Sequence, residues 1–160
     1  MEKLLVVNPE KCTACRRCEL VCSAKKTGEF NPSRSRVTAA LFLEDHFYMP
    51  LVCQHCDEPV CMEVCPAGAI VKNPETGAVT IEEAKCVGCR MCMMACPFGA
   101  IFYSPEEQKM VKCDLCDGEP ECALFCPWGA IEYVEADKAA VAKKKEVANK
   151  LKNALKEVRL

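Results

Sequence analysis

The amino-acid sequence predicts an α+β protein, in which short strands and helices surround groups of cysteines and a long helix follows at the C-terminal end. Three observations support this fold class. The sixteen cysteines fall into four groups of four. The hexapeptide Cys-Pro-x-Gly-Ala-Ile occurs three times, starting at Cys65, Cys96 and Cys126. Residues 135–160 contain no Gly, Pro or Cys and therefore differ in kind from the rest of the chain. The threefold occurrence of the hexapeptide indicates duplication of one structural unit.

The N-terminal third is predicted to hold one strand, one helix and one strand pair. Residues 3–7 form a short apolar strand that ends at Asn8-Pro9. A short helix follows Cys18 and ends at Gly28. After the polar loop 30–36, residues 37–43 and 47–52 form a strand pair around Glu44-Asp45-His46.

Further along, residues 69–71 and 79–81 are predicted to form a hairpin with Gly77 in its turn. In each hexapeptide the Pro turns the chain after the Cys, the Gly permits a close approach of the backbone to a bound group, and Ala-Ile begins a strand. Residues 104–109 are predicted to be a polar linker. Residues 135–160 are predicted to form a basic amphipathic helix, whose apolar stripe is Val147, Leu151, Leu155 and Val158.

The four cysteine groups have the spacings of iron–sulfur ligands. The first and third groups, C-x2-C-x2-C-x3-C, are Cys12, Cys15, Cys18, Cys22 and Cys86, Cys89, Cys92, Cys96. The second and fourth groups have longer central gaps and are Cys53, Cys56, Cys61, Cys65 and Cys113, Cys116, Cys122, Cys126. The third group with its Pro97 is the bacterial ferredoxin run that binds [4Fe–4S] clusters, and the first group has Ser23 in place of the proline. The sequence therefore predicts four [4Fe–4S] clusters.

Disulfides and zinc are the alternative interpretations of so many cysteines. Disulfides are disfavoured because the cysteines have metal-ligand spacing, because no signal peptide is recognisable at residues 1–11, and because a chain with 51% hydrophobic residues does not need crosslinks. Zinc sites use C-x2-C pairs, but a third Cys after two residues and a Pro-flanked fourth are not typical of them.

Composition narrows the expected partners and location. The formal net charge is −2, and four oxidised clusters with their thiolates would add roughly −8 to it. Such an acidic protein is a poor partner for nucleic acid. No apolar run reaches the roughly 20 residues of a membrane span. We expect a cytoplasmic protein.

Four such motifs in this order resemble the four-cluster ferredoxin-like electron-transfer subunits of molybdenum or tungsten oxidoreductases and hydrogenases, over residues 3–134. Cys18-Glu-Leu-Val-Cys22 together with Phe30 to Arg36 is similar to the polyferredoxin subunit of tungsten aldehyde oxidoreductases. Related subunits serve formate dehydrogenase, carbon monoxide dehydrogenase and hydrogenases. The resemblance implies a non-catalytic subunit of anaerobic metabolism. Its expected partners are a catalytic molybdenum or tungsten subunit, a second redox subunit or ferredoxin, and further copies of itself.

The resemblance also implies two nested ferredoxin-like modules. The inner module would be residues 53–103, the outer module would be residues 1–52 with 104–134, and residues 135–160 would be the separate helix. It further implies four ligand sets, numbered here by the motif that supplies three of the cysteines. Set 1 is Cys12, Cys15 and Cys18 with Cys126; set 2 is Cys53, Cys56 and Cys61 with Cys96; set 3 is Cys86, Cys89 and Cys92 with Cys65; set 4 is Cys113, Cys116 and Cys122 with Cys22.

Several other residues need an interpretation. His55 lies inside a complete motif, so we expect it to make a hydrogen bond or lie at the surface rather than bind metal. Trp128 is expected to pack over a cluster. Positive charges surround the first motif and negative charges the fourth, which would raise the first potential and lower the other. These charges are Lys11, Arg16, Arg17 and Asp114, Asp117, Glu119, Glu121.

Two other classes of function stay open at this point. A catalytic iron–sulfur protein needs a cluster with an open iron and hence a motif with three cysteines, whereas all four motifs here have four. An assembly or scaffold protein could act through the C-terminal helix, but sixteen redox ligands have no use in a scaffold alone. No residue is therefore expected to be catalytic.

Overall fold

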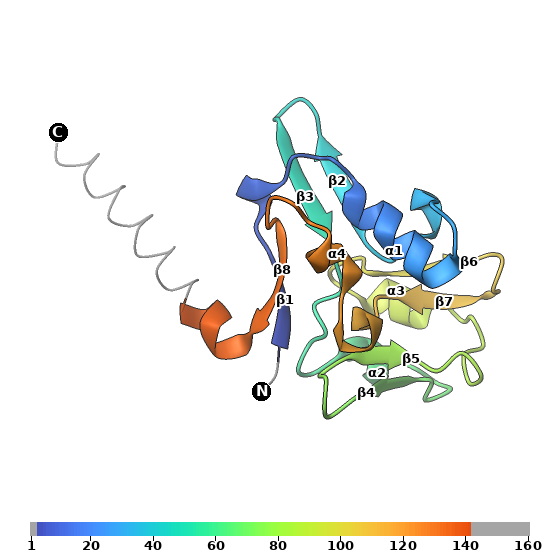
Figure 1. The fold of residues 1–160 in the computed structure, drawn as a ribbon. Helices are drawn as coiled ribbons and strands as arrows, with labels where there is room; N and C mark the ends of the chain where they lie inside the picture. Colours follow the sequence, from blue (N-terminus) through green and yellow to red (C-terminus); the bar gives the residue numbers. More distant parts are fainter. Residues whose placement is uncertain (1–2, 142–160) are drawn as a thin grey trace, which may run out of the picture.

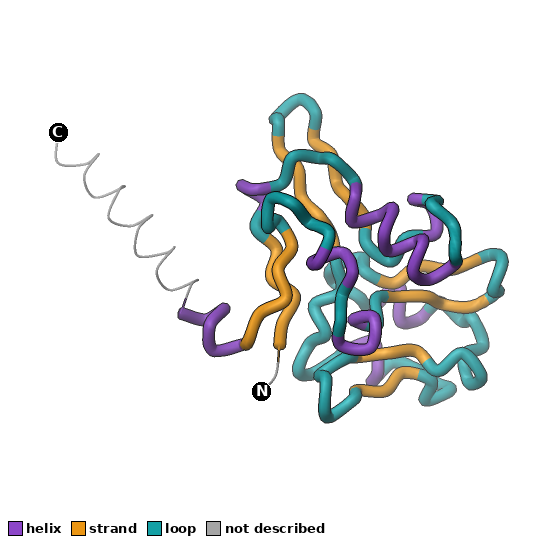
Figure 2. The backbone as a smooth tube through the Cα atoms, viewed as in Figure 1, coloured by secondary structure: helices purple, strands orange, loops and turns teal. Residues whose placement is uncertain are grey.

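A computed structural model of the chain describes residues 3–141, and Figures 1 and 2 show its course. Short helices and strands alternate along the chain, joined by long stretches of loop (Figure 2). The helices are α1 (Arg17–Thr27), α2 (Val60–Glu63), α3 (Met91–Ala95) and α4 (Glu121–Leu124). Single 3-10 turns lie at Pro9–Lys11 and Pro32–Arg34, and Leu115–Gly118 is a turn whose four residues all have positive φ. The α+β class is therefore confirmed.

All the strands of residues 3–141 pair in twos, and every pair is antiparallel. The strands are β1 (Lys3–Val7), β2 (Thr38–Phe42), β3 (Phe47–Leu51), β4 (Ile70–Lys72), β5 (Val79–Ile81), β6 (Ile101–Ser104), β7 (Lys109–Lys112) and β8 (Ile131–Glu135). The pairs β2–β3, β4–β5 and β6–β7 are hairpins between neighbouring strands. The fourth pair joins β1 to β8, with Lys3 opposite Glu135 and Val7 opposite Ile131. Figure 1 shows these strands, far apart in sequence, lying side by side.

Two hydrophobic cores hold these pieces together. The first core consists of Leu5, Cys22, Val37, Val52, Ala78, Leu115, Cys122 and Ile131. Apart from Ala78, its members come from the two ends of the described chain, and α1 packs against α4 beside it. The second core consists of Ile70, Val79, Cys92, Ile101 and Met110, all from the middle. A division into nested modules agrees with these two cores but stays a prediction.

The predicted strand 3–7, the pair 37–43 with 47–52, and the hairpin 69–71 with 79–81 are confirmed within one or two residues. The helix after Cys18 ends as predicted at Gly28, whose φ is +75° and whose N–H is bonded to the carbonyl of Ala24. The predicted linker 104–109 is wrong: Ser104 ends β6, Lys109 begins β7, and the residues between them are a hairpin turn.

The predicted helix 135–160 starts at the edge of the described region. Residue 135 still belongs to β8, and residues 136–141 are helical. Residues 142–160, including the stripe of Val147, Leu151, Leu155 and Val158, lie outside the described residues. Within residues 3–141, no helix is both long and apolar enough to traverse a lipid bilayer.

Candidate iron–sulfur sites

The third cysteine of every motif occupies the same position in a helix. Cys18, Cys61, Cys92 and Cys122 are each the second residue of α1, α2, α3 and α4 respectively. Motifs one and three, with two residues before this cysteine, enter the helix through an arginine in the left-handed region, Arg16 or Arg90. Motifs two and four have the longer gap and enter through a proline. Loops of different length therefore bring the third cysteine of each motif to the same position at the start of a helix.

The residue before the second cysteine of each motif has a positive φ. The angles are +58° at Ala14, +46° at His55, +68° at Gly88 and +59° at Leu115. Only one of the four is glycine, although a left-handed conformation costs other L-residues roughly 1–2 kcal/mol. Backbone strain that recurs at equivalent positions is characteristic of functional sites. In each motif this turn curls the loop between the first two cysteines.

The repeated hexapeptide forms the same turn three times. The N–H of Gly68, Gly99 and Gly129 donates to the carbonyl of the cysteine three residues earlier, at 3.1, 3.3 and 3.3 Å. All three glycines have φ near +60°, and this conformation is the reason for glycine there. In two copies the next N–H donates to the cysteine sulfur, from Ala69 to Cys65 Sγ at 3.3 Å and from Ala130 to Cys126 Sγ at 3.2 Å. An N–H bond to sulfur favours the thiolate form.

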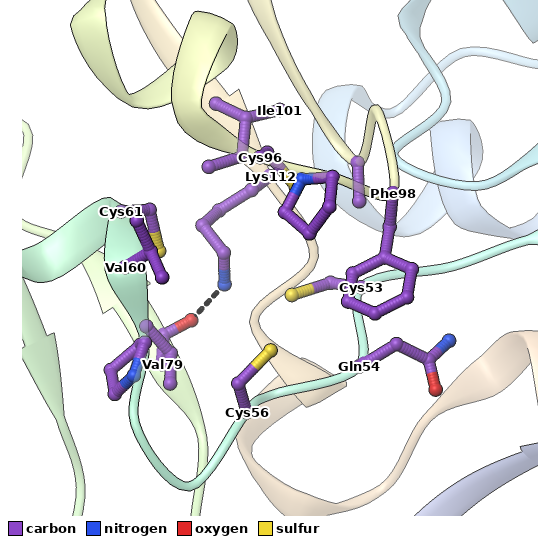
Figure 3. A pocket seen from close by; sticks show the side chains of 13 residues that line it. Cys53, Gln54, Cys56, Val60, Cys61, Val79, Cys96, Phe98, Ile101 and Lys112 are labelled. Atoms are coloured by element: carbon purple, nitrogen blue, oxygen red, sulfur yellow. Dashed lines mark hydrogen bonds between the residues drawn. The ribbon is translucent and has the colours of Figure 1, made fainter.

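The structure brings all four cysteines of set 2 together around one pocket. Cys53, Cys56, Cys61 and Cys96 line it, together with apolar side chains that include Val79, Phe98 and Ile101. Figure 3 shows the sulfurs of Cys53, Cys56 and Cys61 directed into this space. Cys96 belongs to the third motif but lines a pocket with three cysteines of the second motif. Nested ligation requires a fourth cysteine from another motif in this position.

Set 1 surrounds a second pocket. Cys12, Cys15 and Cys18 line it with Cys126, which lies more than a hundred residues away in sequence. Trp128 also lines it, although its side chain is 60% exposed. Trp128 and Phe98 hold the same position in the hexapeptide, and each lines the pocket next to its own cysteine. The expected packing role of Trp128 over the site agrees with this placement.

In sets 3 and 4, the electrostatic neighbours of one buried sulfur include the cysteine that comes from the other motif. The pKa of Cys92 is raised to about 11, mainly by burial, with Cys65 and Cys89 among the neighbours that add to the rise. Cys122 has its pKa raised by burial and then by Cys113, Cys22 and Cys116. The partner from the other motif, Cys65 or Cys22, is therefore close in both sets.

Neighbouring sets approach one another through single cysteines. Cys18 of set 1 acts on Cys122 of set 4, and Cys53 of set 2 acts on Cys113 of set 4. Cys61 of set 2 in turn acts on Cys92 of set 3. These electrostatic neighbours are consistent with the order 1, 4, 2, 3 of the four sets.

Burial dominates the chemistry of these thiols. It raises the pKa of Cys18 and of Cys113 to about 12, and it raises those of Cys61 and Cys116 as well. Several thiols forced together in an apolar space resist ionisation, because each thiolate would repel the next. Iron supplies the compensating positive charge when thiolates bind it. Four cysteine sulfurs around an apolar pocket are thus a donor set that fits an iron–sulfur cluster. In residues 3–141, no three His, Cys, Asp or Glu side chains converge on a site for a single metal ion.

Comparison with known proteins identifies the family. The model of the 4Fe-4S dicluster domain matches residues 44–136, and the model of the 4Fe-4S binding domain matches residues 5–24. The chain belongs to the 4Fe-4S dicluster domain family. The predicted kinship with ferredoxin-like electron-transfer subunits is therefore confirmed, and iron–sulfur binding with it.

Individual relatives agree with this family. The polyferredoxin-like subunit of an aliphatic sulfonate oxidoreductase from Pyrococcus furiosus is 34% identical over 116 residues, which are 72% of this chain and 66% of the relative. A chain of a probable anaerobic dimethyl sulfoxide reductase from Escherichia coli is 37% identical over 122 residues, covering 69% of this chain and 59% of the relative. The chain thus spans less than two thirds of the length of both relatives.

A solved structure matches nearly the whole chain. It is titled active site complex BamBC of benzoyl coenzyme A reductase in complex with zinc. The TM-score is 0.50 at 25% identity, and the match covers 96% of this chain and 97% of that one.

His55 is buried, and its Nδ1 accepts the N–H of Val79 at 2.9 Å. The expected hydrogen-bonding role is confirmed, and the alternative of a surface position is wrong. Its Nε2 is buried without a hydrogen-bond partner in the described residues. Burial, with the positive charges of Lys112 and Lys72 adding to it, lowers the pKa of His55 to about 3. The imidazole is therefore neutral at physiological pH.

The predicted charge contrast between motifs one and four is weakened by pairing. Lys11 pairs with Glu132 at 3.1 Å and Arg16 with the buried Glu19 at 2.5 Å, both near motif one. Near motif four, Asp114 pairs with Lys26 at 2.7 Å and with Arg36 at 3.5 Å, and Glu121 pairs with Lys25 at 3.3 Å. Four of the seven charges thus have counter-ions, whereas Arg17, Asp117 and Glu119 have no ion pair in the described residues, and the effect on the potentials stays a prediction.

One buried residue near the cysteines was not predicted. Lys112 is only 2% exposed and lines the pocket of set 2. The sequence does contain a signal for this residue. Lys112 directly precedes Cys113, so it must lie next to a proposed ligand of the fourth motif.

Proposed function

We propose that this protein is the electron-transfer subunit of an oxidoreductase complex and binds four [4Fe–4S] clusters, one at each ligand set. The observation that supports this proposal is that two pockets are each lined by four cysteines from two different motifs. Two sets line pockets, and the other two have neighbouring sulfurs at their buried members. Each cluster, once bound, accepts and releases single electrons.

The chain's own residues would perform three tasks in this function. Cysteine sulfurs from two motifs hold each site, which makes the geometry of one site depend on the other motif. Apolar side chains such as Val79 and Ile101 keep water from the set 2 pocket. The order 1, 4, 2, 3 of the sets defines a single path, with sets 1 and 3 at its two ends. A donor at one end and an acceptor at the other would then be joined by three inner transfers.

We assign the catalytic partner to the tungsten aldehyde oxidoreductases, with a second redox subunit or ferredoxin at the other end of the path. The support is the sequence resemblance to their polyferredoxin, together with a relative that is itself called a polyferredoxin-like subunit of an oxidoreductase. A molybdenum enzyme is the second candidate, because the Escherichia coli relative belongs to a dimethyl sulfoxide reductase. Further copies of this chain are a third proposed partner.

The cluster number and the exchange of ligands can be tested together. Anaerobically purified protein should contain about sixteen irons and as many labile sulfides, because each cubane holds four of each. Cys126→Ser should abolish the electron paramagnetic resonance signal of the cluster of Cys12, Cys15 and Cys18. The matched variant Cys22→Ser should abolish that of Cys113, Cys116 and Cys122. Variants that each damaged only the cluster of their own motif would refute the nested ligation, and protein without iron would favour a scaffold.

The partner can be tested by anaerobic purification of the tagged chain from its own cells. Tungsten in stoichiometric amount with a large catalytic subunit is the expected result. Molybdenum in its place would exchange the first candidate for the second. Recovery of the chain with neither metal and no other subunit would contradict its role in an oxidoreductase complex.

A further inference from the structure

Lys112 is a buried lysine at the junction between two ligand sets. It is the last residue of β7 and immediately precedes Cys113 of set 4, while its side chain lines the pocket of set 2. Figure 3 shows its amine pointing into the space between Cys61 and the pair Cys53 and Cys56. One residue thus borders both the inner and the outer sets.

Backbone carbonyls hold the amine in place. Lys112 Nζ donates to the carbonyl of Val79, shown by the dashed line in Figure 3, and to the carbonyl of Cys113 at 2.9 Å. The N–H of the same Val79 donates to His55. Val79, which is 1% exposed, is therefore hydrogen-bonded to His55 through its N–H and to Lys112 through its carbonyl. An ammonium has three N–H donors, so one is left for the pocket.

This cation has no carboxylate partner among residues 3–141. Its two partners there are carbonyl oxygens, whereas Lys26 beside set 4 pairs with Asp114. Lysine is almost never fully buried unless its charge is compensated. The cysteine sulfurs of set 2 line the same pocket as Lys112, and Cys113 of set 4 is the next residue in the chain. Burial raises the pKa of Cys61 in set 2 and of Cys113 in set 4, and the charge of Lys112 opposes the rise in both.

We propose that Lys112 is a redox-tuning residue, whose fixed positive charge raises the reduction potential of the cluster in set 2 and, to a smaller extent, that in set 4. This inference rests on the proposed function. An electron that passes from the centre at set 4 to the centre at set 2 oxidises the first and reduces the second. No bond forms or breaks in this transfer. Positive charge near a cluster favours the reduced state because reduction adds negative charge.

Lys112→Met, which keeps the length of the side chain and removes its charge, is the test. Lys109→Met is the matched control, because Lys109 lies on the same strand, donates to the carbonyl of Glu83 and does not line the pocket. Reduction of the full-length protein is followed by electron paramagnetic resonance at defined potentials, with the set 2 signal assigned as the one missing in Cys56→Ser. At a fixed potential, Lys112→Met should lower the ratio of reduced to oxidised set 2 cluster at least tenfold, about 59 mV for one electron.

The control should leave that ratio within a factor of two. Lys112→Gln is the second neutral variant, because its amide can still donate a hydrogen bond to a carbonyl. If Lys112→Met loses iron, the ratio of reduced to oxidised set 2 cluster in Lys112→Gln is the result that tests the proposal. A tenfold fall in either neutral variant with about sixteen irons retained would support the proposal. An unchanged ratio, an equal fall in Lys109→Met, or loss of four irons in both neutral variants would overturn it. Wild-type protein without a set 2 signal would instead contradict the proposed function itself.

Discussion

Ser23 explains why the first motif differs from the other three, and replacing it by proline tests that explanation. In the other motifs a proline follows the fourth cysteine, whereas here α1 continues through Cys22 to Thr27. Ser23 is completely buried, and its Oγ donates to the carbonyl of Leu20 at 2.9 Å and accepts the N–H of Asn31 at 3.1 Å. The continued helix carries the two lysines that pair with Glu121 and Asp114.

The expected loss of stability follows from these contacts. A proline inside a helix costs about 3 kcal/mol, because it removes a backbone donor and clashes with the preceding turn. The two hydrogen bonds of Ser23 Oγ contribute about 1 kcal/mol each. Ser23→Pro should therefore lower the free energy of unfolding by about 5 kcal/mol, and Ser23→Ala, which loses only the two bonds, by about 2 kcal/mol.

Unfolding in guanidinium under anaerobic conditions, followed by far-ultraviolet circular dichroism, measures both variants against the wild type. The informative quantity is the difference between the two variants, about 3 kcal/mol, since both lose the same side-chain hydrogen bonds. Variants that agreed within about 1 kcal/mol would refute the idea that α1 must continue beyond Cys22.

Two further predictions concern single interactions. Burial would raise the pKa of Asp114, but the bond from Lys26 outweighs it and holds the pKa below its ordinary value. The wild type's advantage in stability over Asp114→Asn should therefore be complete above about pH 4 and disappear as the pH falls through the lowered pKa, in unfolding curves from pH 7 to pH 2. Gly88→Ala should be destabilised by about 2–3 kcal/mol, because φ is +68° and the new Cβ would lie 2.9 Å from the carbonyl oxygen of Gln108. Gly68→Ala, with φ of +58° and no atom within 4 Å of its Cβ, should lose only about 1 kcal/mol and serves as the control; equal losses would contradict the steric argument.

The strands and the four cysteine motifs could be predicted because their signals are local or repeated. The apolar run 3–7, the Gly at 77 and the Gly at 28 each mark an element by side-chain chemistry alone. The pairing of β1 with β8 has no such signal, since only the folded chain brings Val7 opposite Ile131. The exchange of cysteines between motifs likewise came from resemblance to a family, because spacing alone does not say which fourth cysteine joins which three.

The hairpin β6–β7 and the buried Lys112 show where sequence reasoning fails. The turn between β6 and β7 uses Gln108 at φ +53°, where a hairpin signal would require Gly or Asn. A stretch with Pro105 and three polar residues therefore resembles a linker. Lysine, in turn, is assigned to the surface by default. Only tertiary packing, which places the Val79 carbonyl opposite its amine, makes Lys112 an interior residue.

The pairing of β1 with β8 also bears on how the protein is made. Residues 3–7 are synthesised before their strand partner at residues 131–135. That partner leaves the ribosome only after all sixteen cysteines have been translated. Domains generally fold in the order of synthesis. The second core, from Ile70 to Met110, can therefore form before β1 has its partner strand β8. The pairing of β1 with β8 therefore has to follow the synthesis of residues 131–135. A polypeptide truncated before residue 131 would leave β1 without its partner, as an unpaired edge strand that is prone to association with other chains.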